Sequence, residues 1–442
     1  MANIEPALVK ALVRKPPVVH GGPRARRMPW PRRRHIDRRE RRAVLRVIDR
    51  EIGRGGAIVY GGEEEKAYCD AFAKYLGGGY AKAVNSGTNA LYVALRALDL
   101  EPGSEIVVPA ITDPGGTMPV ALLNCIPIPA DSDRGFLNTS AEQIKKVLTD
   151  RTSAIVVAHI AGHPVDMDPI LQLAAERRIP VLEDCAQSHG SVYKGRMVGS
   201  LGTISAFSTM FGKQHCTGAQ GGVVFTKDTL LFARARQIAD RGKPHGALGN
   251  PANLVASLNF NQDEISMAIG RVQLEKLPLA IRARRTFASL VETGLQGVDG
   301  VTFVGDKPGL AGSYWFLMIR LDPSKIVCDS QQFATALLEE GIDGVYAGYP
   351  FFPTDQPWHR DAVVFGKSGL PWSALTGHPR PMHFELPNAH QATREIVRVD
   401  VHESLGDGEA RDLVTAVKKL AQYFRAASRP PATVDASQAV HI

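Results

Sequence analysis

The chain has 442 residues, which at about 100–200 residues per domain allows two or three domains. Hydrophobic residues make up 44% of the chain and charged residues 22%, a composition that excludes a disordered or fibrous protein. No apolar run approaches the ~20 residues of a membrane span, and the arginine-rich beginning lacks the apolar stretch of a secretory signal. The five cysteines are too scattered for a disulfide scaffold or a zinc knuckle, so we expect a cytoplasmic protein with no membrane partner.

The net charge of +7 is unevenly distributed along the chain. Residues 1–45 carry +10, whereas the remainder carries −3. A nucleic-acid-binding protein usually shows its basic face within a folded module, next to aromatic or groove-reading side chains. Here the charge lies in a proline- and arginine-rich stretch that contains a single Trp30. We therefore expect residues 1–45 to form a basic N-terminal arm on the surface, and we expect no nucleic-acid partner.

Apolar spacing predicts two helices after the arm, Arg38–Ile52 and Glu63–Leu76, and then an alternation of strands and helices. The expected strands are short and apolar, namely Tyr80–Val84, Glu105–Pro109, Ile126–Ala130, Ala154–His159 and Val181–Glu183. The expected helices between them are Asn89–Leu98, Met118–Asn124, Ala141–Leu148 and Asp168–Arg177. This alternation predicts an α/β domain whose mainly parallel sheet is covered by helices on both faces.

The pattern changes beyond residue 200, where two predicted strands are joined by a polar, glycine-containing loop instead of a helix. Those strands are Thr203–Ser208 and Gly222–Thr226, and helices follow at Leu230–Arg241 and from Ile265 to about Leu295. Further strands are expected at Val301–Val304 and Tyr314–Arg320, and further helices at Ser330–Glu339 and Gly408–Phe424. We expect a large domain at 46–285, a small α+β domain at 286–425 and a loose tail at 426–442.

Three loops at the ends of predicted strands contain unusual polar groups, and ligands of open parallel sheets bind beyond the carboxyl ends of the strands. The first loop, Asn85–Asn89, combines a turn at Gly87 with the free N–H groups of a helix start, which favour an anion. Taken alone, an ordinary helix cap is the simpler interpretation of this loop.

The second and third loops contain an acid and a base. Asp184 ends a buried strand, so its carboxylate needs either a structural hydrogen bond or a cationic ligand. Lys213 lies among Gly, Phe and Cys with no acidic neighbour in its segment. In such a setting a lysine amine loses its proton readily and forms Schiff bases.

An anion cradle, a strand-end aspartate and a loop lysine in this order fit pyridoxal 5′-phosphate (PLP), held by its phosphate, its ring nitrogen and its aldehyde. No metal is expected, because His159 and His163 are four residues apart without a glutamate-containing zinc helix. A nicotinamide-binding fold is disfavoured, because no Gly-x-Gly-x-x-Gly follows the first predicted strand.

The ordered combination of these motifs resembles the DegT/StrS family of PLP-dependent aminotransferases, which act on keto sugars and keto cyclitols. The resemblance runs from about Arg38 to about Tyr423, and it depends on Asn85–Thr88, Glu183-Asp184 with Gln187, Tyr193–Arg196, Ser208 five residues before Lys213, and Gly221-Gly222. It implies fold-type I, with a large, mainly parallel domain built on a sheet of seven strands and a smaller α+β C-terminal domain. It also implies a homodimer with shared active sites.

The resemblance assigns roles to individual residues. Lys213 is the implied catalytic lysine, which binds the cofactor aldehyde, and Asp184 and Gln187 are the implied neighbours of the cofactor ring. The implied phosphate-binding residues are Gly87, Thr88, Ser208 and, reaching across from the neighbouring subunit, Asn259.

Three departures from the family pattern concern ring stacking and substrate contacts. Asp113–Gly116 stands where the family usually has an aromatic ring, and Asn261 stands where an arginine is common. Gln220 replaces a common glutamate, in a loop one residue longer than usual. We take Asp113, His189 and Asn261 as candidate substrate contacts, while noting that Asp, Pro and Gly are also favoured turn residues.

The sequence thus predicts transfer of an amino group from glutamine or glutamate to a keto sugar or keto cyclitol, in natural-product or surface-sugar biosynthesis. Two alternatives stay open: a PLP enzyme of the same fold that performs elimination, dehydration or oxidation on a sugar, and a non-catalytic regulatory relative. Lys213 argues against the dehydrating branch of the family, in which a histidine replaces the lysine.

Overall fold

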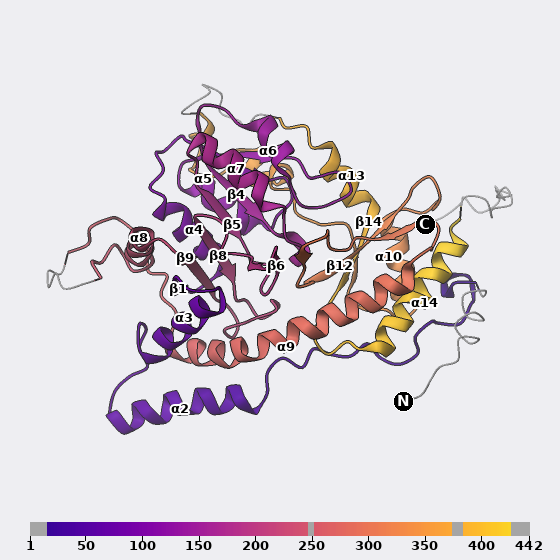
Figure 1. The fold of residues 1–442 in the computed structure, drawn as a ribbon, viewed down its shortest axis with the longest axis horizontal. Helices are drawn as coiled ribbons and strands as arrows, with labels where there is room; N and C mark the ends of the chain where they lie inside the picture. The colour runs from indigo at the N-terminus through magenta and orange to yellow at the C-terminus, as the bar shows by residue number, and fades with distance from the viewer. Residues whose placement is uncertain (1–15, 246–251, 374–382, 426–442) are drawn as a thin grey trace.

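A seven-stranded sheet forms the centre of the larger half of the molecule (Figure 1). The computed structural model describes residues 16–245, 252–373 and 383–425. The strand order is β1-β9-β8-β5-β4-β2-β3, and every strand is parallel except β9, which is antiparallel to both of its neighbours. The strands are β1 Tyr80–Val84, β2 Glu105–Pro109, β3 Ile126–Ala130, β4 Thr152–Ala158, β5 Val181–Asp184, β8 Ile204–Ser208 and β9 Gly222–Thr226.

Helices cover both faces of this sheet, because almost all strand side chains are apolar and buried. One face packs against α4 Gly87–Ala97, α5 Met118–Leu122 and α8 Thr229–Ala239. The other face packs against α3 Glu63–Tyr75, α6 Ala141–Val147, α7 Met167–Arg177 and the first half of α9 Glu264–Leu295. This is the predicted α/β arrangement, and it brings the carboxyl ends of β1, β2, β5 and β8 to one edge.

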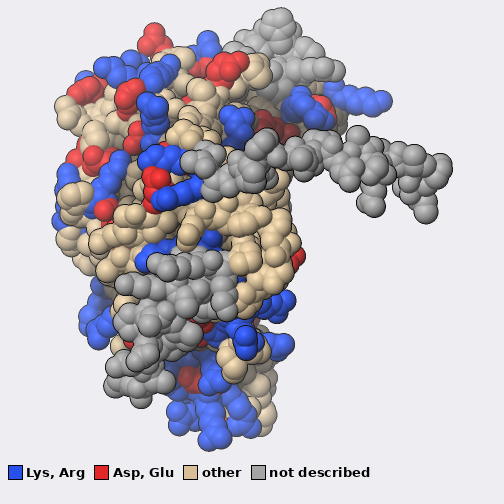
Figure 2. Space-filling view, turned by 90° about the vertical axis from the view of Figure 1, so that its right-hand side faces the viewer, with Lys and Arg blue, Asp and Glu red and all other residues tan. Residues whose placement is uncertain are grey.

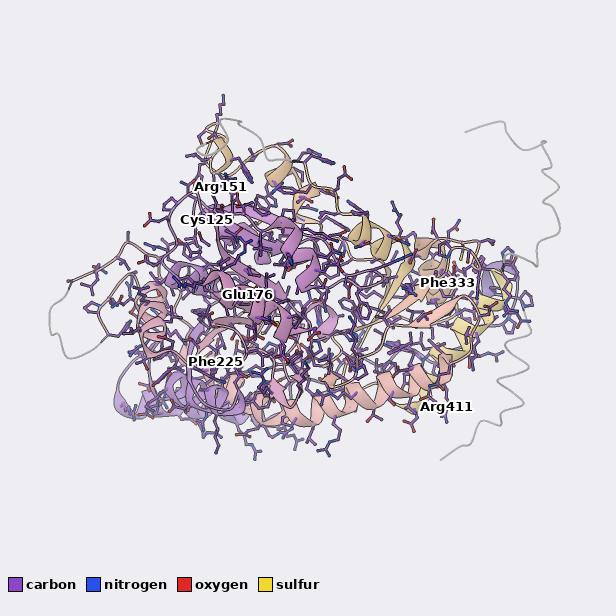
Figure 3. All side chains as sticks on the ribbon, turned by 45° about the horizontal axis from the view of Figure 1, so that its top comes forward. Cys125, Arg151, Glu176, Phe225, Phe333 and Arg411 are labelled. Carbon is purple, nitrogen blue, oxygen red and sulfur yellow. The ribbon has the colours of Figure 1, made fainter. Side chains whose placement is uncertain are left out.

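The smaller half contains a four-stranded antiparallel sheet that packs against helices. Its strands are β10 Val301–Phe303, β12 Phe316–Leu321, β13 Val345–Ala347 and β14 Ile396–Asp400, and its helices are α10 Ser330–Glu339 and α14 Asp407–Tyr423. The second half of α9 completes this core, so one continuous helix runs through residue 285 into both halves. Phe225 and Phe333, labelled in Figure 3, belong to the separate cores of the two halves.

The sequence pattern did not predict the pairings between short strands that are distant in the chain. A three-stranded sheet joins β6 Val192–Tyr193 and β7 Arg196–Met197 to β11 Leu310–Ala311 across the two halves. Two-residue strands are too short to show a periodicity of alternate side chains, so no pattern marks them. The strands β13 and β14 also escaped prediction, as did the short helices α11 Pro357–Arg360 and α13 Pro387–Glu395.

The predicted N-terminal arm divides into two parts. Residues 16–37 lie along the smaller half and pass beneath α9 in the view of Figure 1, and they include a short helical turn, η1 Val18–His20. The helix α2, Arg38–Arg54, then packs its apolar face on α9. The lower end of the molecule in Figure 2, where α2 lies, is rich in Lys and Arg.

Residues 1–15 and the predicted tail, 426–442, are outside the described residues. None of the described helices is both long enough and apolar enough to cross a membrane.

Candidate active site

The loop that carries Lys213 joins β8 to β9 and is held closed by its own hydrogen bonds. The Thr209 N–H donates to the Gly221 carbonyl at 2.8 Å, and the Thr217 N–H donates to the Thr209 carbonyl at 3.0 Å. A Cβ at Gly221 would lie 2.1 Å from Thr217 Oγ1, so only glycine allows this approach. The loop thus has one compact conformation at the edge of the sheet.

The Lys213 amine is buried beside an indole ring. The residue is 6% exposed, and its Nζ lies 3.7 Å from the centre of the Trp315 ring. Burial lowers the pKa of Lys213 to about 8, although the carboxylates of Asp113 and Asp184 act in the opposite direction. About a tenth of the amine is therefore uncharged at pH 7 and about half at pH 8, and the uncharged form is the nucleophile.

Asp184 is the last residue of β5 and is 5% exposed. Its Oδ1 accepts a hydrogen bond from the Ala186 N–H at 3.0 Å, while Oδ2 has no hydrogen-bond donor among the described residues. Burial raises the pKa of Asp184 to about 6. The free oxygen can therefore accept a hydrogen bond from a ligand, and a cationic donor would stabilise its charged form.

The predicted anion cradle forms where the start of α4 meets the end of β8. The Ser86 side chain caps α4 by accepting from the Asn89 N–H at 3.1 Å. A Cβ at Gly87 would lie 2.5 Å from Ser208 Cβ, so the two backbones touch. Gly87, Thr88 and Ser208 are thus brought together at a helix start, which favours an anion.

Gln187 is buried and both ends of its amide are engaged. Its Oε1 accepts from the Ala161 N–H at 2.8 Å, and its Nε2 donates to the Tyr349 hydroxyl at 2.8 Å. Trp315 is linked to the same place, because its N–H donates to the Ala161 carbonyl at 2.8 Å. Gln187 therefore connects the strand ends of the sheet to residues of the smaller half.

Asp113 begins a single helical turn, η2 Pro114–Gly116, and its Oδ1 accepts from the Gly115 N–H at 3.0 Å. This is the turn that the residue types predict. The residue is exposed, and its charge acts on both Lys213 and Asp184. A Cβ at Gly115 would lie 2.4 Å from Thr88 Oγ1, so the turn sits directly against the cradle.

His189 lies in an aromatic cluster of the large core. It is 1% exposed, and its Nε2 donates to the Ser208 carbonyl at 2.7 Å. Its ring is 5.1 Å from the Phe207 ring, and burial lowers its pKa to about 4. A substrate has no access to a side chain in this position, so we assign His189 the structural role of holding the strand end that bears Ser208.

Asn259 and Asn261 contact each other. Asn259 is exposed, and its Oδ1 accepts from the Asn261 Nδ2 at 2.8 Å. The Asn261 Oδ1 in turn accepts from Lys82 Nζ at 3.1 Å. Within the described chain, none of their hydrogen bonds involves Lys213, Asp184 or Ser208.

A model of the DegT/DnrJ/EryC1/StrS aminotransferase family matches residues 39–418. The chain belongs to this family. The GDP-perosamine synthase of Caulobacter vibrioides is 33% identical over 82% of this chain and 87% of its own length. The L-glutamine:2-deoxy-scyllo-inosose aminotransferase of Micromonospora echinospora is 30% identical over 80% of this chain and 86% of its own length. The crystal structure of an aminotransferase from Psychrobacter cryohalolentis superposes with a TM-score of 0.79 at 27% identity, covering 90% of this chain and all of that one.

Membership in the DegT/DnrJ/EryC1/StrS aminotransferase family confirms the predicted fold-type I architecture and the predicted activity class, amino transfer. The match also agrees with the predicted extent of the resemblance, which began near Arg38.

Two site residues of this family member escaped sequence reasoning. Trp315 covers the Lys213 amine, and its indole N–H also donates to the Gly212 carbonyl at 3.1 Å. Tyr349 lies beyond the predicted strands and is buried against Gln187. Both residues lie in aromatic-rich segments whose pattern predicts core positions, so the sequence alone did not indicate that they belong to the site.

One buried cluster has the residue types of a metal site, His159, Glu183 and Cys185. Its His159 Nε2 donates to Glu183 at 3.2 Å, and its Nδ1 accepts from the Val165 N–H at 3.0 Å. Glu183 also accepts from three backbone N–H groups, those of Gly199, Leu201 and Gly202. The ring's lone pair and the carboxylate are therefore already used in binding loops to β5.

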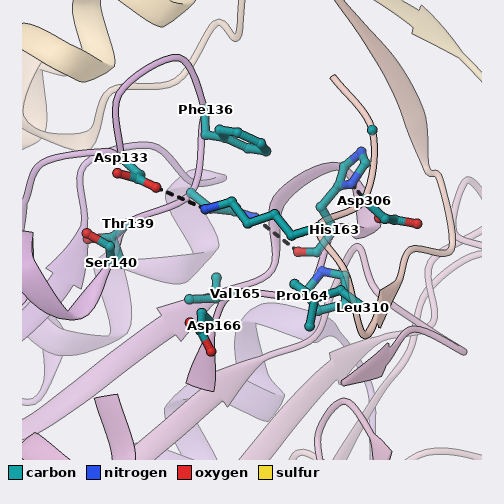
Figure 4. A pocket seen from close by; sticks show the side chains of 13 residues that line it. Asp133, Phe136, Thr139, Ser140, His163, Pro164, Val165, Asp166, Asp306 and Leu310 are labelled. Atoms are coloured by element: carbon teal, nitrogen blue, oxygen red, sulfur yellow. Dashed lines mark hydrogen bonds and ion pairs between the residues drawn. The ribbon is translucent and has the colours of Figure 1, made fainter. Parts of the chain in front are cut away.

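A small pocket lies at the junction of the two halves (Figure 4). There His163 Nδ1 pairs with Asp306 at 2.9 Å, and Lys307 pairs with Asp133 at 3.1 Å. Asp306 also accepts from the Tyr314 hydroxyl at 2.9 Å. The polar side chains of this pocket therefore already bind one another, and we assign the pocket a role in fixing the smaller half next to Trp315.

Proposed function

We propose that this protein is a PLP-dependent aminotransferase that moves an amino group from glutamine or glutamate to a keto sugar or keto cyclitol. The observation that carries the proposal is the burial of the Lys213 amine against the Trp315 ring, where its pKa is lowered and the charges of Asp184 and Asp113 act on it. The two named relatives, whose names specify an amino sugar and a keto cyclitol, support this acceptor class.

The described residues fit the cofactor on independent grounds. The start of α4 offers N–H groups beside Gly87, Thr88 and Ser208 for a phosphate. The unpartnered Oδ2 of Asp184 suits a protonated ring nitrogen, and Lys213 offers an amine for an aldehyde. When bound, PLP supplies an aldehyde that condenses with amines and a ring that accepts electrons.

The chain's own residues would then carry out three tasks. Lys213 would bind the cofactor and, once released, move a proton at its Nζ to and from the substrate carbon. Asp184 would remain charged and keep the ring nitrogen protonated. Trp315 would exclude water from the amine, which its ring covers.

We further propose a homodimer in which Asn259 completes the phosphate site of the partner. Two exposed apolar side chains precede Asn259 in the chain, Leu254 at 56% exposed and Leu258 at 64%, and exposed apolar groups of this kind are typical of an interface. The test mixes two inactive variants, Lys213→Ala and Asn259→Ala. Restored activity in the mixed dimers supports a shared site, whereas full activity of a monomeric preparation contradicts it.

The chemical outcome is tested by direct assay. Purified protein with PLP receives glutamine or glutamate and a panel of keto sugars and keto cyclitols, free and nucleotide-linked. We expect an amino product and the matching keto acid in equal amounts. Release of water or ammonia without an amino product would instead support elimination, and no turnover together with no cofactor absorbance would support a regulatory relative.

A further inference from the structure

We propose that Arg33 and His35 of the N-terminal arm are positioning residues for Lys213, holding the loop of residues 209–221 against the smaller half. Both residues precede the segment that the family match covers, which begins at residue 39. The proposal assigns the arm a task at the active site.

The arm's path is fixed before it reaches the site. The Glu340 carboxylate accepts from the Val18 N–H at 3.1 Å and from the Ala25 N–H at 2.8 Å. Arg26 pairs with Asp412 of α14 at 2.6 Å, and Lys419 of the same helix donates to the Pro23 carbonyl at 2.6 Å. These contacts are partly buried, so this part of the arm is packed against the smaller half.

At its far end the arm touches the lysine loop on both sides of Lys213. Arg33 Nη1 donates to the Phe211 carbonyl at 3.3 Å, two residues before the lysine. His35 Nε2 lies 3.1 Å from Cys216 Sγ, three residues after it. The side chains of Arg33 and His35 are 17% and 13% exposed; the His35–Cys216 contact is partly buried, whereas the Arg33–Phe211 hydrogen bond lies at the surface.

A single carboxylate joins the arm to the residue that covers the amine. Glu403 accepts from Arg33 Nε at 2.9 Å, contacts His35 Nδ1 at 3.1 Å and pairs with Arg284 Nη2 at 3.1 Å. Burial would raise the pKa of Glu403, but the hydrogen bond from His35 and the two guanidinium groups hold it well below its ordinary value. The carboxylate is therefore charged at neutral pH and anchors all three donors.

Arg284 extends this connection to Trp315. It is 1% exposed, and its Nη1 donates to the Tyr314 carbonyl at 3.0 Å. Tyr314 precedes Trp315, which covers the Lys213 amine and donates to the Gly212 carbonyl. The loop is thus held at Phe211, Gly212 and Cys216 from the side of the smaller half, and the arm supplies two of these three contacts.

The consequence concerns the rate of reaction and not the binding of substrate. Neither arm residue touches the cradle, Asp184 or Asp113 among the described contacts, so substrate affinity has no reason to change. Loss of the two contacts frees the loop, and a displacement of a catalytic group by ~1 Å can cost ~100-fold in rate. For a partial loosening we expect a decrease in kcat of about 10-fold with KM within about 2-fold of the original.

The test compares Arg33→Gln and His35→Leu with a matched control, Arg32→Gln. Arg32 is the adjacent arginine, is exposed, and has no hydrogen bond or ion pair within the described chain. The first readout is amide hydrogen exchange of the cofactor-free protein. We expect faster exchange in peptides that cover 209–221, with peptides of α10 unchanged, in the two test variants but not in the control.

The second readout, kcat against KM, rests on the proposed function, whereas the exchange measurement does not. Unchanged exchange in the loop of both folded variants would overturn the proposal, as would an equal change in Arg32→Gln. If one variant fails to fold, the other still decides, because Arg33 and His35 contact opposite sides of the lysine. Arg33→Lys should recover part of the rate, since it keeps the charge next to Glu403; no recovery in a folded Arg33→Lys protein would contradict the role assigned to that pair.

Discussion

The two sides of the candidate site are built in different ways. The strand-end side consists of Asp113, Asp184, Ser208 and Lys213, each of which follows or ends a strand of the large sheet. The small-domain side consists of Trp315 and Tyr349, with Glu403 behind them. On the strand-end side each residue has its position set by the strand that precedes it. On the small-domain side each depends on contacts with residues more than a hundred positions away.

This difference indicates that the two sides of the site have different tasks. The strand-end side contains Lys213 and Asp184, the groups proposed to bind the aldehyde and the ring of a cofactor, next to the proposed phosphate cradle. The small-domain side contains the Trp315 ring, the hydrogen bond between Tyr349 and Gln187, and the ion pairs of Glu403, which set the environment of one amine. Substitutions on the first side should therefore abolish chemistry, whereas those on the second should change its rate or its pH dependence.

The largest expected effect follows from removing the amine. Lys213→Met should reduce amino transfer by roughly 1,000-fold or more, because it removes the amine proposed to bind the cofactor aldehyde and to move the proton. It should also stabilise the cofactor-free protein at pH 7 by about 3 kcal/mol, at ~1.4 kcal/mol per unit of pKa, because a buried ammonium no longer has to be accommodated.

The sign of that stability effect can be checked by pH. Folding lowers the pKa of Lys213 to about 8, so its cost is fully present below pH 8 and disappears as the pH rises toward the unfolded value. The increase in the free energy of unfolding caused by Lys213→Met, measured by urea unfolding, should therefore become smaller as the pH rises above 8. Lys227→Met, which alters an exposed lysine, is the control and should change neither activity nor stability.

The second effect tests whether the strand-end side needs its buried charge. Asp184→Asn should lower the rate by about 100-fold or more, because an amide cannot stabilise a positive ring nitrogen. Because burial raises the pKa of Asp184 to about 6, cofactor affinity of the unaltered protein should fall as the pH drops through 6. The affinity of Asp184→Asn should not show that fall. Equal pH profiles for the two proteins would contradict the assignment, and Asp168→Asn on the surface serves as the control.

A smaller effect isolates the small-domain side. Trp315→Ala should admit water to the Lys213 amine and raise its pKa above about 8, measured by the pH dependence of its labelling with an amine reagent in the cofactor-free protein. Trp315→Phe keeps a ring but loses the hydrogen bond to Gly212, at a cost of about 1 kcal/mol, and should leave that pKa almost unchanged. If both variants behave alike, the ring does not shield the amine.

The smallest effect concerns Asp113. Asp113→Asn keeps an oxygen that can accept from the Gly115 N–H, so the turn should survive. If the carboxylate also contacts the acceptor, KM for the acceptor should rise by about 3- to 10-fold with little change in kcat, corresponding to a charged hydrogen bond. Unchanged kinetics would leave Asp113 as a turn residue only, and Asp133→Asn is a control outside the site.

What the sequence could predict matches this division. The strands that end in Val84, Asp184 and Ser208 carry strong local signals, and their order fixed which loops meet at the sheet edge. Trp315 and Tyr349 carry no such signal, because an aromatic residue in an apolar segment gives the same sequence pattern whether its ring fills a core or covers an amine. His189 shows the opposite error, since a polar residue beside a motif invites a functional reading that its burial does not support.

The arm shows a further limit of local patterns. Its composition predicts a basic arm on the surface, but not that Arg26 and Arg33 pair with Asp412 and Glu403, hundreds of residues away. Such pairs cannot be found from spacing, because either member alone is an ordinary surface residue.

The central claim is that Lys213 is the residue that binds the cofactor, and reduction with borohydride tests it directly. The protein loaded with PLP is reduced, digested and mapped by peptide mass. The account predicts the pyridoxyl adduct on Lys213 and on no other lysine, and its absence in Lys213→Met. An adduct on Lys194 or Lys227, with Lys213 unmodified, would contradict the account.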